Sequence, residues 1–162
     1  MSRGHAGIRR GGGALAGLLL VLALLTTGLV TDHARAAEDV PLRDKMLTLT
    51  NQDREEHDEK ALKLNAKLSR YAARHSADMA EEGELVHTSV DALVEKLNDL
   101  GIEWSTAGEN IGVGSSLRTV QKAFMRSTLH RQNILNGDYD HAATGVFEAP
   151  DGSFWVTVIF YG

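Results

Sequence analysis

The apolar residues near the start of the folded region recur with helical spacing. Leu42, Met46 and Leu49 lie four and three residues apart, which predicts a first helix. The charged stretch that follows has no apolar stripe, so we expect this helix to end near His57. Residues 37–44 then remain as a short N-terminal tail, and the domain itself is expected over residues 45–162.

A second and a third helix carry both a stripe and end signals. The second begins at a capping Asn65 and stops at Gly83, with an apolar face made by Leu68, Ala72, His75 and Met79. The third is capped by Ser89 and stops at Gly101, with a face made by Val90, Leu93, Leu97 and Leu100. Both patterns are typical of helices that cover one side of a core.

The middle of the chain is richer in glycine. Residues 108–114 read Gly-Glu-Asn-Ile-Gly-Val-Gly, which indicates a glycine-flanked loop that presents Glu109 and Asn110, followed by a short strand. Ser115 or Ser116 then caps a fourth helix, whose apolar face holds Leu117, Val120 and Phe124.

The C-terminal residues alternate in the manner of β-strands. Two segments, 145–148 and 153–161, flank the sequence Ala-Pro-Asp-Gly, which predicts a hairpin. Both alternating sets of the last strand are largely apolar, so this strand is expected in the middle of a sheet that is covered on both faces. Helices on both faces of a small antiparallel sheet make an α+β fold, a three-layer α-β-α sandwich.

The first 36 residues have the composition of an export signal. Three arginines precede a nearly unbroken apolar run from 14 to 30, and Ala34-Arg35-Ala36 supplies small residues two apart. We expect a signal peptide that is cut after Ala36, by the general or the twin-arginine route, and no stable membrane span afterwards. A retained anchor is the alternative, since the apolar run is near the lower length for a span.

Charge and cysteine content narrow the function. Removing residues 1–36 leaves 13 of the 17 Lys/Arg and 21 of the 22 Asp/Glu, a net charge of −8. This balance argues against nucleic acid as a partner and against docking on anionic lipid by charge alone. The chain has no cysteine, which excludes thiol catalysis and cysteine-ligated metal.

His87, Glu109 and His130 are the residues with the clearest chemical potential. Two imidazoles and a carboxylate could hold a divalent metal such as zinc with open positions, or could transfer protons. Each could equally serve its own segment, because the three do not form a compact ligand motif. Ser127 lies three residues before His130, a spacing that fits a helix cap better than a nucleophile. Trp104 either lines a cleft or packs its own loop.

Several short motifs occur together in an order that resembles the CAP superfamily, which comprises cysteine-rich secretory, antigen 5 and pathogenesis-related proteins. The resemblance extends over nearly all of 45–162 and is closest to the cysteine-free bacterial branch. It rests on Asn51-x-x-Arg54, Ala73-x-His75-x-x-Asp78-Met79, His87-Thr88-Ser89, Gly108-Glu109-Asn110-Ile111 and Ser127-x-x-His130-Arg131-x-Asn133-Ile134-Leu135.

The resemblance implies an α-β-α sandwich with a central cleft that holds two histidines and two acidic residues. His87, Glu109 and His130 match three of these positions. The fourth position, a glutamate three residues after a tryptophan, is Ser127 after Phe124 here, which weakens the case for two-carboxylate chemistry.

Three functions follow as expectations. The first is a secreted or wall-associated binding module, whose cleft takes a divalent metal, a small ligand, a lipid or a peptide. Its expected ligand-binding residues are His87, Glu109, His130, Ser127 and Asn110. The second is a metal-assisted extracytoplasmic hydrolase in which Glu109 acts as base or third ligand. The third is a wall-associated structural protein with an inert cleft.

Overall fold

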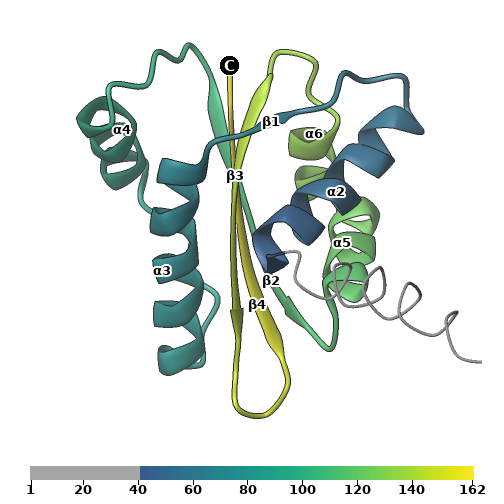
Figure 1. Cartoon of the computed structure of the whole chain (residues 1–162), viewed down its shortest axis with the longest axis vertical. Helices are drawn as coiled ribbons and strands as arrows, with labels where there is room; N and C mark the ends of the chain where they lie inside the picture. Colours follow the sequence, from purple (N-terminus) through teal and green to yellow (C-terminus); the bar gives the residue numbers. More distant parts are fainter. Residues whose placement is uncertain (1–40) are drawn as a thin grey trace, which may run out of the picture. The chain divides into compact units, whose positions relative to one another are not determined.

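A four-stranded sheet lies between two layers of helices (Figure 1). The computed structural model describes residues 41–162, which form one compact unit. With the labels of Figure 1, the helices are α2 (Leu42–Glu55), α3 (Ala66–Glu82), α4 (Val90–Asp99), α5 (Leu117–Arg126) and α6 (Thr128–Ile134). The strands are β1 (Lys63–Leu64), β2 (Ala107–Gly114), β3 (His141–Glu148) and β4 (Phe154–Tyr161).

The sheet order β1-β3-β4-β2 confirms the central position that was expected for the last strand. Strand β4 pairs with β3 and with β2, both antiparallel, while the two residues of β1 pair with β3 in parallel. The side chains of β4 divide between two hydrophobic clusters. Val156, Val158 and Phe160 pack with α2, α5 and α6, and Ile159 and Tyr161 pack with α3 and α4. The predicted three-layer sandwich is therefore confirmed.

Most predicted helix ends are confirmed by their hydrogen bonds. Asn65 Oδ1 accepts from the backbone N–H groups of Lys67 and Leu68 at the start of α3, and Gly83 ends that helix with a φ of 71°. Ser89 caps α4, and Ser116 rather than its neighbour caps α5. Helix α2 begins at Leu42, inside the expected tail, and ends two residues earlier than expected.

The loop predicted around Glu109 and Asn110 was wrong, whereas the short strand predicted after Asn110 is confirmed. Residues 107–114 form β2, which pairs along its whole length with β4. The glycines serve close packing rather than a turn: a Cβ added at Gly112 would lie 2.8 Å from the ring of Phe124. Helix α6 and the first half of β3 were likewise not expected from the sequence.

The predicted signal peptide, residues 1–36, lies outside the described residues, as do positions 37–40. Within residues 41–162, no helix is both long and apolar enough to cross a membrane.

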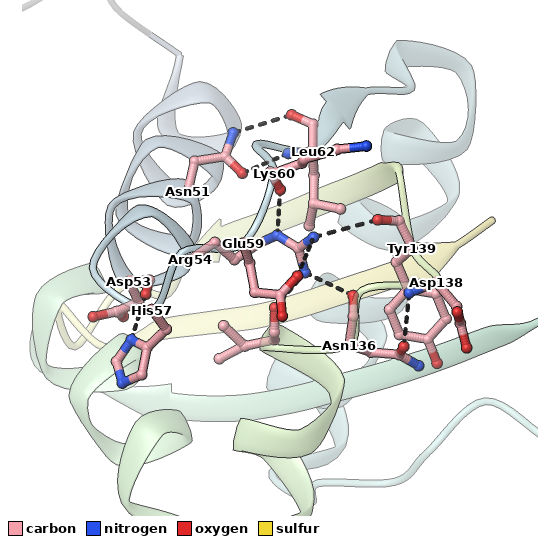
Figure 2. Close-up of polar contacts among 11 residues, drawn as sticks. Asn51, Asp53, Arg54, His57, Glu59, Lys60, Leu62, Asn136, Asp138 and Tyr139 are labelled. Carbon is pink, nitrogen blue, oxygen red and sulfur yellow. Dashed lines mark hydrogen bonds and ion pairs between the residues drawn. The ribbon is translucent and has the colours of Figure 1, made fainter.

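A fully buried guanidinium joins α2 to the segment that follows α6 (Figure 2). Every nitrogen of the Arg54 side chain donates to a backbone carbonyl: Nε to Lys60 at 2.7 Å, Nη1 to Ile134 at 2.7 Å and Asn136 at 2.9 Å, and Nη2 to Tyr139 at 3.3 Å. The nearest carboxylate, that of Glu59, is 4.0 Å away. Burial lowers the pKa of Arg54 from its ordinary value, and the negative charge of Glu59 opposes this shift.

Replacing this guanidinium should be costly. We expect Arg54→Met to lower the free energy of unfolding by about 3–5 kcal/mol, because it leaves the carbonyls of Lys60, Ile134 and Tyr139 without a donor. Urea denaturation measures the loss. The exposed Arg74 on α3 offers a control, since Arg74→Met should change stability by less than about 0.5 kcal/mol. A loss below about 1 kcal/mol for Arg54→Met would show that water replaces the guanidinium.

Candidate functional site

The carboxylate of Glu109 is almost fully enclosed and fully engaged. Its side chain is 6% exposed on the edge strand β2. Oε1 accepts from His87 Nδ1 and from the Thr88 backbone N–H, both at 2.9 Å, and Oε2 accepts from the Thr88 hydroxyl at 2.7 Å. These contacts fix the carboxylate against the α3–α4 connection, so Glu109 is an oriented anchor.

The contact with Glu109 also determines which nitrogen of a neutral His87 ring carries the proton. A carboxylate only accepts hydrogen bonds, so the proton of a neutral His87 imidazole lies on Nδ1. Its Nε2 is then the ring atom that can accept a hydrogen bond or bind a metal. The side chain of His87 is 57% exposed, which leaves this nitrogen accessible from solvent.

His130 reaches the same region from the opposite helical layer. Its ring packs edge-on against Phe124, with 5.0 Å between the ring centroids. Burial is the main cause that lowers the pKa of His130 below its ordinary value, and the positive charge of protonated His87 lowers it further. The two imidazoles are therefore close enough to influence each other.

Asn110 ties α6, the helix that carries His130, to β2. Its side chain is fully buried; Nδ2 donates to the His130 carbonyl at 2.9 Å, and Oδ1 accepts from Asn133 Nδ2 at 2.8 Å. Asn133 also donates to the Glu109 carbonyl at 3.3 Å. Gly108 permits this close approach, because an added Cβ would lie 2.8 Å from Asn133 Oδ1.

An apolar groove of about 340 Å³ opens beside the Glu109 carboxylate. Trp104 lines this groove, which was one of the two roles expected for it. Its indole nitrogen donates to Asn98 Oδ1 at 3.4 Å. The remaining wall comes from α4, the α3–α4 connection and the start of β2: His87, Thr88, Val90, Leu93, Val94, Leu97, Ala107, Gly108 and Glu109. One end of the groove is thus polar and the rest is apolar.

The structure brings the predicted site residues together unequally. His87 and Glu109 are in direct contact, His130 is linked to them through the charge of His87, and Asn110 supports α6. Ser127 begins α6 without a side-chain cap bond. Within residues 41–162, no three His, Asp or Glu side chains are grouped so that they could share one metal ion.

Thr88 is the site residue that the sequence did not single out. It supplies two of the three donors that hold Glu109. The only signal for Thr88 in the sequence was its place directly after His87. The spacing of 21 residues did not indicate that its hydroxyl would bind Glu109 on β2.

Comparison with known proteins assigns the chain to a family. The model of the cysteine-rich secretory protein family, CAP, matches residues 47–160. The chain belongs to the CAP family. YkwD of Bacillus subtilis, an uncharacterised protein, is 36% identical over 114 residues, which cover 68% of this chain and 44% of YkwD. The chain spans less than half the length of the curated relatives that it matches.

Solved structures of CAP proteins share this architecture. An extracellular protein with an SCP domain from Bacillus anthracis has a TM-score of 0.63 and 25% identity, over 74% of this chain and 39% of its own. The cysteine-rich secretory protein SAV1118 from Staphylococcus aureus has the same TM-score at 24% identity, over 74% and 38% of the two chains. These matches agree with the family assignment and confirm the fold.

The lowered pKa of His130 predicts how stability depends on pH. Below its ordinary value of 6.5, the unfolded chain takes up this proton before the folded chain does. The His130 contribution to stability is therefore complete above that value and is lost as the pH falls through it toward the folded pKa. NMR titration of the ring should place the folded pKa below the ordinary value.

Removing the second cause of the shift provides a check. In His87→Ala the pKa of His130 should rise part of the way toward its ordinary value, because burial remains. His57→Ala, which removes an exposed histidine outside the site, should leave it unchanged. A native His130 that titrates at or above its ordinary value would contradict the burial seen here.

Proposed function

We propose that this CAP protein is an extracytoplasmic binding module that holds a small ligand or peptide in the cleft beside β2. The observation that carries this proposal is the full engagement of the Glu109 carboxylate by His87 and Thr88. A carboxylate with both oxygens occupied is suited to orient His87 and is poorly suited to take a proton from water. The apolar groove next to it supplies the contact area that a bound ligand needs.

We infer that a divalent metal binds at the His87 end of this cleft. The His87–Glu109 pair resembles the carboxylate–histidine pairs in which a carboxylate orients a metal-binding imidazole. His87 donates its Nδ1–H to Glu109, and its Nε2 is available to a metal. His130 is the second imidazole. Two histidines leave further positions of an ion such as zinc to water or to the ligand. When bound, the metal would attract a donor atom of the ligand. Glu109 would not touch the metal but would fix the His87 ring through its hydrogen bond to Nδ1.

Hydrolysis is less well supported by the same contacts. It requires a group that activates water, and both oxygens of Glu109 already accept hydrogen bonds from His87 or Thr88. The Ser127 hydroxyl makes no hydrogen bond with His130 within residues 41–162, so a serine nucleophile has no base. A location outside the cytoplasm agrees with the expected signal peptide and with the B. anthracis relative, which is described as extracellular.

Calorimetric titration with zinc tests the proposal on the protein that begins at Ala37. The double variant His87→Ala/His130→Ala should lose binding, because both imidazoles are gone. Glu109→Gln should weaken binding by about 10- to 100-fold, because Glu109 accepts the His87 Nδ1–H and thereby orients the ring that binds the metal. His57→Ala is the matched control and should bind as the native protein does.

Equal zinc affinity in the native protein and the double variant would reject the metal site. Peptide hydrolysis by the native protein that disappears in Glu109→Gln would instead establish the hydrolase. A native protein that binds neither zinc nor peptides in the cleft would favour the structural role.

A further inference from the structure

Positive charge is concentrated in one part of an otherwise acidic chain. Residues 110–137 contain four Lys/Arg and no Asp or Glu, whereas the chain after position 36 has a net charge of −8. These residues comprise most of β2, α5 and α6. The net charge of the whole domain therefore does not describe this surface.

Helix α5 places three of the four cations along its outer face. Leu117, Val120, Gln121 and Phe124 are buried, while Arg118, Lys122 and Arg126 are exposed. The three cations are four residues apart, so each is about 6 Å further along the helix axis than the one before. Together they form a row about 12 Å long, which we call the α5 cationic row.

No carboxylate neutralises this row. Within residues 41–162, none of Arg118, Lys122, Arg126 and Arg131 takes part in an ion pair. Asp53 of the adjoining α2 accepts instead from Gln121 Nε2, at 2.6 Å. The charges of the row are thus available to a partner.

The row continues into a groove where α5 meets α6. The groove has a volume of about 490 Å³ and is lined by Met125, Arg126, Thr128, Arg131, Gln132 and Leu135. Arg131 Nη2 lies 3.1 Å from His57 Nε2, a contact in which the arginine donates to a neutral ring and keeps its charge uncompensated. Two guanidinium groups beside hydroxyl and amide side chains suit a phosphate-bearing chain with polar links.

We propose that the α5 cationic row and the adjoining groove bind a linear phosphodiester polymer of the poly(glycerol phosphate) type. The row matches a chain of regularly repeated anions, and the groove gives such a chain a concave seat. This binding is independent of the cleft beside β2.

Two other polyanions fit the surface less well. Binding in a membrane interface uses several apolar side chains, and within the described α5 and α6 the only exposed large apolar side chain is Leu129. Single-stranded nucleic acid is bound by stacking on aromatic side chains. The one Phe, Tyr or Trp of α5 and α6, Phe124, is buried, and the His130 ring packs against it.

Titration of the exported protein with poly(glycerol phosphate) at several salt concentrations tests the proposal. Affinity should fall as salt rises, with a log–log slope of about −0.7 for each phosphate that is neutralised. The triple variant Arg118→Gln/Lys122→Gln/Arg126→Gln should bind at least about tenfold more weakly at low salt, and its slope should be smaller by about 2. Glutamine is a good helix former, so an unchanged thermal unfolding midpoint is expected for the variant.

The chain offers a control with the same change in net charge. Lys67→Gln/Arg70→Gln/Arg74→Gln removes three exposed cations from α3, in the opposite layer, and should bind as the native protein does. Equal weakening of both triple variants would overturn the proposal, because net charge alone would then explain binding. Tighter binding to phosphatidylglycerol vesicles or to a single-stranded oligonucleotide than to the polymer, at equal phosphate concentration, would also overturn it.

Discussion

The buried guanidinium of Arg54 is the constraint that positions α6, the helix that carries His130. A cation without solvent is tolerated only where its donors are satisfied, and here backbone carbonyls rather than a carboxylate satisfy them. One of these is the carbonyl of Ile134 at the end of α6, where a positive charge also complements the helix dipole. Arg54 therefore fixes the short helix that carries His130, although it lies on another element and outside the site.

A second set of hydrogen bonds holds α6 against strand β2 of the sheet. Asn133 and Asn110 join α6 to β2 through side-chain amides that are shared with the backbone of His130 and Glu109. Thr88 then secures the Glu109 side chain to the opposite layer. The edge strand β2 is thus held between two layers by polar contacts, with His87 bonded to it from one layer and the backbone of His130 from the other.

Much of the architecture could be predicted from the sequence because it follows from periodicity. Capping residues and apolar stripes located α3, α4 and α5, and the two apolar faces of β4 indicated a covered sheet. The errors concern segments that tertiary contacts determine. Residues 107–110 lack the β-branched side chains of an ordinary strand, and pairing with the buried β4 decides their conformation. Helix α6 is too short to show a stripe, and Arg54 and Asn110 hold its carbonyls.

The net charge, like sequence periodicity, does not describe every local surface of this protein. A net charge of −8 argues against anionic partners only if the charges act together. At physiological ionic strength, exposed charges are screened beyond about 8 Å, and the α5 cationic row is about 12 Å long. A partner at its centre therefore lies within the screening length of all three cations of the row. Because α6 both carries His130 and lines the groove, Arg54, which holds the end of α6, supports the candidate site and the groove together.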